Sequence, residues 1–290
     1  WVQCCDRVVM FEFGENLVHC GLRKFIPTYR FIRIQADTFD KHHVHQRELD
    51  GNSIKVLTWN IAKNNHQRQW LRDFEAIQQY YQPDILIFQE VRFSMNAEHA
   101  VDLPEMSWSF APNFMDAHHS AYAGVLTAAK TNPLSSRAIV TSHYEPIAQT
   151  PKVSLVTEYA IANHPHPLLV VNSHLINFVD LHQFKSQLAD LEQTLETHSG
   201  PILFAGDFNI WSQSRFSVLE DAATRLGLRS VHFSSHYRKK IKRFLFSPPL
   251  DYIFYKGLRE RQTTAYVLDE FSSSDHKPLW AEFVISPNAT

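Results

Sequence analysis

The sequence predicts a mixed α/β fold, because short apolar runs alternate along the chain with segments of helical spacing. The runs are rich in β-branched and aromatic residues and are bounded by polar or turn-forming residues, which is typical of strands buried inside a sheet. The predicted strands are Ile54–Trp59, Ile85–Phe88, Leu168–Val171, Ile202–Ala205, Tyr252–Tyr255 and Leu279–Val284.

Three segments between these strands have the spacing of amphipathic helices. Over residues 70–81 and again over residues 181–195, large apolar side chains recur at three- and four-residue steps. A third helix is predicted from about Gln213 to Leu226, where Gly227 provides a C-terminal stop.

The composition indicates a globular chain with a sizeable core. Apolar residues make up 44% of the 290 residues and charged residues 20%. The formal net charge is −2, so the chain lacks the strong positive field of a protein that coats nucleic acid nonspecifically. Any contact with nucleic acid would therefore use a local basic patch.

The cysteines indicate a reducing compartment, and we expect a cytoplasmic protein. Cys4, Cys5 and Cys20 form an odd, clustered set that suits neither a disulfide framework nor a zinc site. No apolar run approaches the ~20 residues of a membrane-spanning helix. The sequence predicts no protein partner.

Residues 1–52 differ from the rest of the chain and carry no catalytic pattern. They contain all the cysteines and end in the turn formers Asp50-Gly51-Asn52, although residues 29–34 could form a strand. We therefore expect an N-terminal appendage over residues 1–52 and one catalytic domain over residues 53–286.

Polar clusters follow four of the predicted strands directly, and two more clusters precede the last two strands. If the last strands run antiparallel to the first, all six clusters meet at one edge of the sheets. One such coincidence would mean little, but six together predict an active site. The clusters are Asn60; Gln89-Glu90; Asn172-Ser173-His174; Gly206-Asp207-Phe208-Asn209; Asp251; and Asp275-His276.

The chemistry of these clusters favours hydrolysis of a phosphate ester. Their carboxylates are hard oxygen ligands of the type that Mg²⁺ or Mn²⁺ prefers. This stretch contains no cysteine, which excludes a thiolate zinc site, and the chain has no phosphate-binding G-x-x-x-x-G-K-[ST] motif. A bound cation with histidine and asparagine donors offsets charge on a phosphoryl group, while a carboxylate or imidazole activates water.

The clusters and their neighbours form an ordered set of motifs: Trp59-Asn60, Gln89-Glu90, Asn172-Ser173-His174-Leu175, Gly206-Asp207-Phe208-Asn209, Leu250-Asp251-Tyr252 and Ser274-Asp275-His276-x-Pro-Leu. Over about residues 54–285 this set resembles the endonuclease/exonuclease/phosphatase superfamily. Residues 199–201, 206–212 and 250–258 are similar to the small bacterial YafD-type proteins within it. The resemblance implies a DNase I-like fold, a four-layer α/β/β/α sandwich of two packed mixed sheets flanked by helices.

The resemblance also implies a ligand set and a nucleophile. Glu90 would be the principal ligand of Mg²⁺, with Mn²⁺ as an alternative, helped by Asn60 and Asp275. Asp207 would position or deprotonate the attacking water, and Asn209 would contact the phosphate.

Two histidines complete the implied machinery. Asp251 would hold His276 in one tautomer, so that His276 binds or protonates a phosphate oxygen. His174 would act as a phosphate ligand or as the acid for the leaving group.

Basic residues near Asp251 are candidate substrate contacts. The run at 238–243, with Arg238, Lys239 and Lys240, could clamp an anion or form a solvated face. The adjoining residues 244–246 could stack on bases, enter a lipid surface or form a buried strand. Arg215 could reach the leaving group or simply pack against the following helix.

Three functions stay open at this point. The favoured one is a phosphodiesterase of the nuclease type, because the basic run at 238–243 accompanies a complete metal set. The second is a phosphatase or phosphodiesterase for inositol phosphates or phospholipid-type substrates. The third, a catalytically silent scaffold, is disfavoured because every motif residue is intact. Taken singly, Asp207 or Asn209 could be a turn former.

Overall fold

Two packed β-sheets and their flanking helices make up the computed structural model, which describes residues 31–33, 37–94, 101–146, 149–261 and 265–286. The nine-stranded sheet has the order β1 (Phe31–Arg33), β5 (Ser107–Asp116), β6 (Ala121–Ala129), β4 (Ile85–Ser94), β3 (Ile54–Asn60), β15 (Leu279–Ile285), β13 (Leu258–Glu260). In addition, β2 (Phe39–Lys41) pairs with β5, and β14 (Tyr266–Val267) pairs with β15. The six-stranded sheet has the order β11 (Arg229–Ser230), β12 (Asp251–Lys256), β10 (Ile202–Asp207), β9 (Leu168–His174), β8 (Val153–Tyr159), β7 (Ser135–Val140).

Both sheets are mixed. The pairs β3–β4 and β9–β10 are parallel, whereas β15 is antiparallel to β3 and β12 is antiparallel to β10. The expected reversal of the last two strands is therefore confirmed, and their N-terminal ends lie at the edge where β3, β4, β9 and β10 carry their polar clusters.

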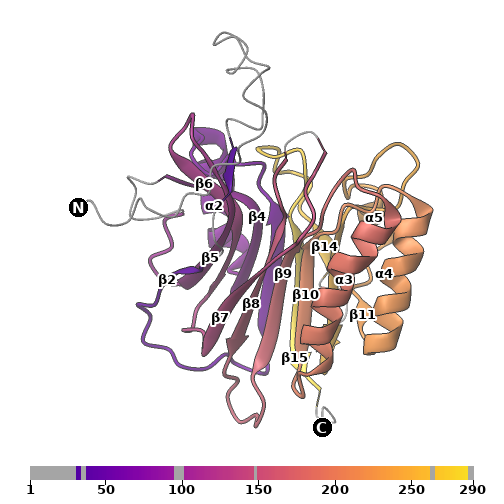
Figure 1. Cartoon of the computed structure of the whole chain (residues 1–290). Coiled ribbons are helices and arrows are strands. Elements are labelled where there is room, and N and C mark those ends of the chain that lie inside the picture. Colours follow the sequence, from indigo (N-terminus) through magenta and orange to yellow (C-terminus); the bar gives the residue numbers. More distant parts are fainter. Residues whose placement is uncertain (1–30, 34–36, 95–100, 147–148, 262–264, 287–290) are drawn as a thin grey trace, which may run out of the picture.

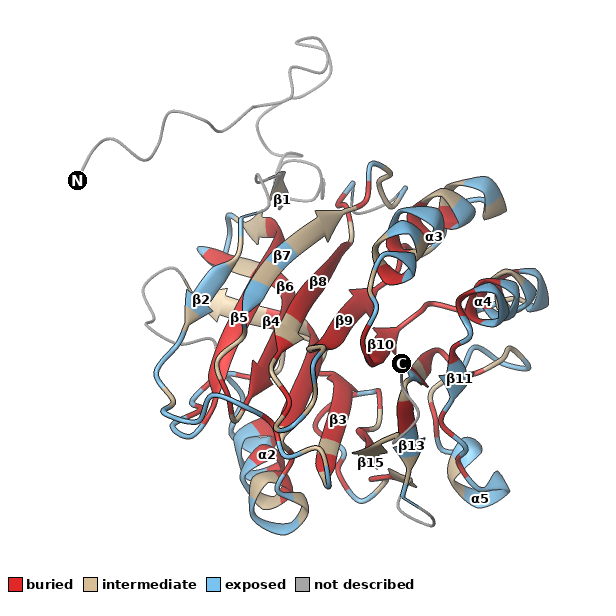
Figure 2. Ribbon diagram, turned by 90° about the horizontal axis from the view of Figure 1, so that it is seen from below, coloured by how far each residue is buried: buried red, intermediate tan, exposed pale blue. Residues whose placement is uncertain are grey.

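The helices cover the outer faces of the two sheets (Figures 1 and 2). Helix α2 (Arg68–Tyr81) packs on the first sheet, while α3 (Leu181–Glu196) and α4 (Gln213–Leu226) lie side by side on the second. The fourth described helix, α5 (Ser235–Arg238), is a single turn before β12. The three predicted helices and the four-layer sandwich are thus confirmed, and Gly227 ends α4 with a φ of 68°.

Strand alternation explains why the polar clusters point between the sheets. In β3, Ile54 and Val56 belong to the core between the two sheets, whereas Leu57 and Trp59 pack against α2. Successive side chains on a strand point to opposite faces, so Asn60 shares the inward face with Val56. The same register makes Asp207 inward-facing in β10, because Leu203 and Ala205 lie in the inter-sheet core.

Buried hydrogen bonds of Asn172 join the two sheets inside this core. Gln89 Nε2 in β4 donates to Asn172 Oδ1 in β9 at 2.9 Å, and both side chains are fully buried. Asn172 Nδ2 in turn donates to the main-chain oxygens of Leu126 and Phe88, at 2.9 and 3.1 Å. Buried hydrogen bonds between two sheets favour a single relative placement of those sheets.

The sheet extends into the segment that was predicted as an appendage. Strands β1 and β2 lie before residue 53, yet both pair with β5, and Leu49 bridges to Ile161. Part of the 29–34 strand prediction is confirmed by β1, and the cysteines lie outside the described residues. Within the described ranges, no helix combines the length and apolarity needed to cross a lipid bilayer.

Candidate active site

The predicted clusters meet at the edge between the two sheets, around the carboxylate of Asp207. Asn60 Nδ2, from the first sheet, donates to Asp207 Oδ2 at 2.9 Å. The Nε2 atoms of His174 and His276 each lie 3.7 Å from the same oxygen. Asp207 Oδ1 accepts from the main-chain N–H of Asn209 at 3.0 Å. Groups that are far apart in sequence therefore share one buried centre.

A β-bulge aims Glu90 into this centre. The register of β4 against β6 shifts between Phe88 and Val91, and Glu90 has a φ of 52°. In regular alternation Glu90 would point toward α2, as Phe88 does; the extra residue turns it toward the site instead. Its Oε1 lies 3.5 Å from Asn60 Nδ2 and 4.0 Å from His174 Nε2.

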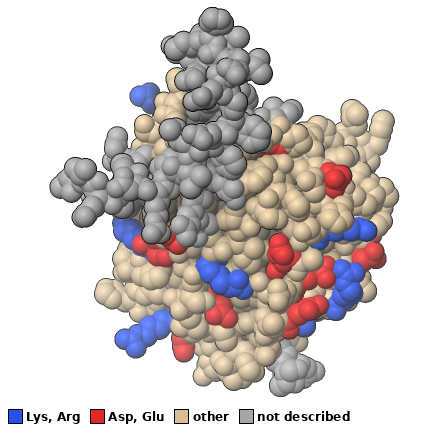
Figure 3. Space-filling view, viewed as in Figure 1, with Lys and Arg blue, Asp and Glu red and all other residues tan. Residues whose placement is uncertain are grey.

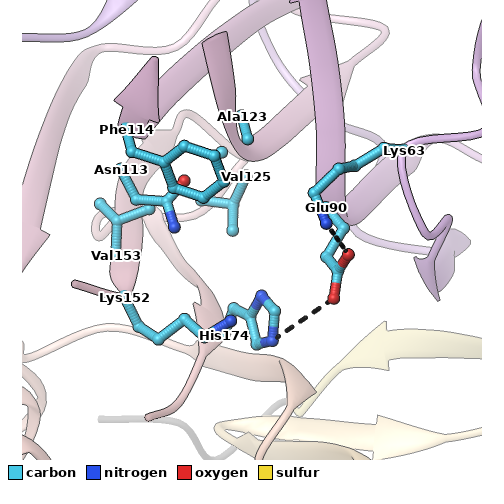
Figure 4. A pocket seen from close by; sticks show the side chains of 10 residues that line it. Lys63, Glu90, Asn113, Phe114, Ala123, Val125, Lys152, Val153 and His174 are labelled. Atoms are coloured by element: carbon cyan, nitrogen blue, oxygen red, sulfur yellow. Dashed lines mark hydrogen bonds and ion pairs between the residues drawn. The ribbon is translucent and has the colours of Figure 1, made fainter. Parts of the chain in front are cut away.

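Two lysines flank Glu90 and His174 in a small pocket, drawn in Figure 4. Lys63 donates to the Glu90 carboxylate, and Lys152 pairs with Glu145 at 3.3 Å. Burial, the largest single influence, would raise the pKa of Glu90, but Lys63, His174 and Lys152 together outweigh it, so that the pKa is lowered and the group is a carboxylate. The pocket thus joins a carboxylate to two cations.

His276 and Asp251 form a buried pair. His276 Nδ1 lies 2.8 Å from Asp251 Oδ2 and 3.0 Å from Oδ1. Burial lowers the pKa of His276, but the carboxylates of Asp251 and Asp207 together raise it to about 9. The ring is therefore an imidazolium that donates from Nδ1 to Asp251 and keeps its Nε2–H toward Asp207.

This pairing predicts a high titration point for His276 in chelator-treated protein. The folded pKa exceeds the unfolded value of 6.5, so the pair contributes stability that is complete below about pH 6.5 and is lost as the pH rises through about 9. In Asp251→Asn the ring should titrate at a distinctly lower pH. NMR titration of the histidine ring signals measures both values, and an unchanged His276 signal in the variant would contradict the assignment.

His174 has the opposite charge state. Burial lowers its pKa, and nearby Lys152 lowers it further. The carboxylates of Asp207 and Glu90 oppose this shift, and the resulting pKa is about 3. At neutral pH the site therefore holds one neutral imidazole and one imidazolium.

The loop that carries Asp275 and His276 is tied to the end of β3. Trp59 Nε1 donates to the main-chain oxygen of His276 at 3.0 Å, and Ser274 Oγ donates to that of Asn60 at 2.7 Å. Asp275 itself turns outward: its side chain is 64% exposed and accepts from Lys242. Of the three predicted metal ligands, the structure brings Asn60 and Glu90 together and leaves Asp275 on Lys242.

A second group of possible ligands lies deeper. Asp207, Asp251 and His276 are all buried and offer ligand atoms within 4.8 Å of one another. Because His276 Nδ1 is engaged by Asp251, only its Nε2 faces Asp207. The three residues therefore form a row in which Asp251 is hydrogen-bonded to His276, and His276 Nε2 lies 3.7 Å from Asp207 Oδ2.

Asn209 and Arg215 stabilise the loops that follow β9 and β10. Asn209 has a φ of 50°, and its Nδ2 donates to the main-chain oxygen of Leu175 at 2.8 Å. Arg215 is 1% exposed and donates to the carbonyls of Ile176, Asn209 and Val179 at 2.8, 3.1 and 2.9 Å. A guanidinium engaged in this way ties the loops after β9 and β10 together, so the predicted contact of Arg215 with substrate finds no support.

The basic run divides into paired and exposed cations. Lys240 pairs with Asp269 at 2.7 Å, and Lys242 pairs with Asp275. Arg238 and Lys239 are exposed. Their contact with substrate stays a prediction, and Lys240 already has a carboxylate partner.

The buried-strand interpretation of residues 244–246 is wrong. Phe244, Leu245 and Phe246 form an exposed turn between α5 and β12. A run of three apolar residues suggests burial, but the Ser247-Pro248-Pro249 segment after it cannot continue a strand ladder.

Sequence reasoning missed Lys63 and gave Lys152 no weight. A lone lysine carries no motif, and its charge becomes informative only when the fold brings it to Glu90 and His174. The position of Lys63, three residues after the strand-end Asn60, was the available signal.

Comparison with known proteins bears out the resemblance. A model of the Endonuclease/Exonuclease/phosphatase family matches residues 57–276, which is more than half of the chain. A UPF0294 protein of Vibrio parahaemolyticus is 35% identical over 240 residues, covering 82% of this chain and 80% of that protein. UPF0294 proteins are of the YafD type, so the predicted branch is confirmed.

Solved structures share the fold at low identity. The catalytic domain of human Nocturnin with a bound sulfate anion has a TM-score of 0.60 at 20% identity, covering 87% of this chain and 98% of that one. ANGEL2, a 2′,3′-cyclic phosphatase in complex with adenosine-2′,3′-vanadate, has a TM-score of 0.56 at 16% identity, covering 86% and 98%. These likenesses confirm the DNase I-like arrangement of two mixed sheets flanked by helices.

Proposed function

Because the chain belongs to the Endonuclease/Exonuclease/phosphatase family, we propose that it is a phosphodiesterase that depends on a divalent cation, with Mg²⁺ as the ion and Mn²⁺ as a substitute. The observation that carries the proposal is the convergence on Asp207 of Asn60, His174 and His276, with Glu90 beside them. The family fold is one of phosphoester hydrolases. The reaction, the ion and the roles of these side chains are the proposed part.

The donor set around Glu90 fits a hard cation. The Glu90 carboxylate is 26% exposed, and Lys63 already provides a positive charge at its oxygens. The Asn60 side chain lies at the same place, with its Nδ2 3.5 Å from Glu90 Oε1. Its Oδ1, which accepts from the Ala62 N–H at 3.0 Å, would be the ligand atom. A divalent cation held by Glu90 and Asn60 would neutralise phosphoryl charge and lower the pKa of water. Asp275 would join this set only after releasing Lys242.

Asp207 is suited to orient and deprotonate the attacking water. Its two oxygens are oriented by the Asn60 carboxamide and the Asn209 N–H, so the carboxylate cannot rotate freely. A general base with a fixed orientation contributes about 10²–10⁴-fold to the rate.

The two histidines divide the remaining work. The His276 imidazolium can donate its Nε2–H to a phosphoryl or leaving-group oxygen, while Asp251 holds Nδ1. His174 is neutral at pH 7, so it can bind a phosphoryl oxygen but is a poor proton donor. Protonation of the leaving group is therefore assigned to His276, and His174 is assigned to binding.

The surroundings favour a diester over a monoester. Two different surfaces adjoin the strand ends that carry the site: the pocket with Lys63 and Lys152, and the side chains of Phe178 and Trp211. A diester has one substituent for each surface. A phosphomonoesterase is the second candidate, because two lysines beside one carboxylate also suit a dianionic phosphate.

The charge distribution argues against a long nucleic acid held through many phosphates. On the face drawn in Figure 3, positive and negative side chains are interspersed, and the net charge is −2. Binding that relies on many phosphate contacts uses a continuous basic surface. A short nucleic-acid segment stays a candidate substrate.

The test is hydrolysis by chelator-stripped protein of bis-p-nitrophenyl phosphate and p-nitrophenyl phosphate, with Mg²⁺ or Mn²⁺ added back. We expect diester turnover that needs the ion. In Glu90→Gln, the ion concentration for half-maximal rate should rise at least about tenfold, because a neutral carboxamide replaces the charged ligand.

Glu196→Gln, an exposed change of the same kind on α3, is the matched control and should behave as the wild type. Turnover confined to the monoester would establish the second candidate instead. An ion requirement that Glu90→Gln leaves unchanged would refute the proposed ligand.

A further inference from the structure

Large apolar side chains are exposed beside the candidate site. Among the residues described, nine large hydrophobic side chains are exposed, and five of them gather in three loops at this place. They line one apolar groove together with Ser212, Gln213, Ser247 and Pro248. Such a concentration marks an interaction surface. The five are Phe178 at 56% exposure, Trp211 at 36%, Phe244 at 48%, Leu245 at 88% and Phe246 at 102%.

Each of the three loops is attached to a strand end that carries a site residue. Phe178 follows His174, Trp211 follows Asn209, and residues 244–246 precede Asp251. A molecule seated on this surface is therefore adjacent to the Asp207 centre.

Two of these exposed residues have strained backbone conformations. Phe178 has a φ of 53° and Leu245 a φ of 44°, a region that bulky residues rarely adopt. The turn at the tip is closed by hydrogen bonds, since Ser247 N donates to the Phe244 oxygen at 2.7 Å and Phe244 N donates to Ser247 Oγ at 2.9 Å. The apex, Leu245-Phe246, is thus an ordered apolar projection.

Exposed cations stand at the base of this projection. Arg238, Lys239 and Arg243 are exposed, whereas Lys240 and Lys242 already pair with Asp269 and Asp275. Apolar side chains at a tip, with lysine and arginine behind them, match the boundary of an anionic bilayer, where acyl chains lie beneath negative headgroups.

We propose that the Leu245-Phe246 apex docks this protein on the surface of an anionic phospholipid membrane. The exposure of the apex favours this occupant over a nucleobase. A stacking base covers one face of a ring, and Leu245 has no ring, whereas the acyl region of a bilayer can surround a side chain that is exposed on all sides. Docking would bring headgroup phosphodiesters beside the Asp207 centre, and this last step rests on the proposed phosphodiesterase activity.

The test is co-sedimentation with vesicles of phosphatidylcholine, alone or mixed with phosphatidylglycerol, in the presence of a chelator so that no turnover occurs. We expect the wild type to pellet with the anionic vesicles. Leu245→Ser/Phe246→Ser should lower the partition coefficient at least about tenfold, because two exposed apolar side chains no longer enter the bilayer. Lys239→Gln/Arg243→Gln should weaken the preference for phosphatidylglycerol.

The matched control is Tyr80→Ser/Leu134→Ser, which removes side chains of 74% and 61% exposure near the end of α2 and directly before β7, outside the apolar groove. It should bind like the wild type. A wild type that stays in the supernatant with both vesicle types would overturn the proposal, as would apex variants that still pellet. The wild type could instead bind a single-stranded oligonucleotide and no vesicles, and the apex variant could lose that binding. This result would identify a nucleobase, and not a membrane, as the ligand of the apex.

Hydrolysis of soluble bis-p-nitrophenyl phosphate separates this result from the proposed function. The apex variant should keep the wild-type rate, because neither side chain belongs to the catalytic centre. Docking without hydrolysis would support the docking surface and refute the proposed activity. Hydrolysis without docking would support the activity and refute the docking surface.

Discussion

Replacement of Asp207 by asparagine should lower kcat for phosphodiester hydrolysis by about 10³-fold. The carboxamide keeps the shape of the side chain but cannot accept a proton from water. It also turns one favourable contact into a repulsive one, because Asn60 Nδ2 donates to Asp207 Oδ2 and an amide nitrogen there would have no acceptor. His276 loses one of its two carboxylate neighbours as well.

Steady-state kinetics with bis-p-nitrophenyl phosphate measure this effect, and circular dichroism checks that the fold is retained. Asp190→Asn on the exposed side of α3 serves as the control and should be neutral. A kcat within tenfold of the wild type would show that Asp207 is not the base.

Replacement of Gly206 by alanine should destabilise the protein by at least about 4 kcal/mol. The reason is space as well as conformation. Gly206 has a φ of 142°, and a Cβ built on it would lie 1.9 Å from the main-chain oxygen of Ser173 on the neighbouring strand. Because β9 and β10 are hydrogen-bonded there, neither strand can move without breaking the ladder.

Urea denaturation gives the free energy of unfolding for this variant. Gly227→Ala isolates the conformational part, since Gly227 also has a positive φ but its nearest neighbour to a new Cβ is the flexible end of Lys256 at 4.0 Å. That control should cost about 1–2 kcal/mol. Equal losses in the two variants would mean that the strands adapt to the new methyl group.

The parts of the fold that were predictable are those whose pattern is local. Apolar side chains three and four residues apart favour a helix from local sequence alone, and α2 and α3 were predicted in this way, while Gly227 marked the end of α4. Strand ends followed by Asn60 or Asp207 were likewise visible. Strands β5 and β6 were missed because small and polar residues interrupt them, as Ser107, Ser109 and Thr127 do, although all three are fully buried.

The parts that were not predictable depend on long-range placement. The bulge that turns Glu90 toward the site is visible only in the pairing of β4 with β6. The partner of Asp275 is likewise a matter of placement, since Lys242 lies 33 residues earlier in the chain. The burial of Arg215 follows from three loop carbonyls that no sequence pattern announces.

The contact between Gln89 and Asn172 has a consequence for how this protein would lose activity and which residues selection would preserve. Asn60 and Glu90 come from one sheet, whereas His174, Asp207 and Asp251 come from the other. A small slip between the sheets would separate these half-sites while every helix and strand persisted. On heating, the protein would then lose activity before its helices and strands unfold. Selection for turnover would act on the residues between the two sheets as strongly as on the groups that touch substrate.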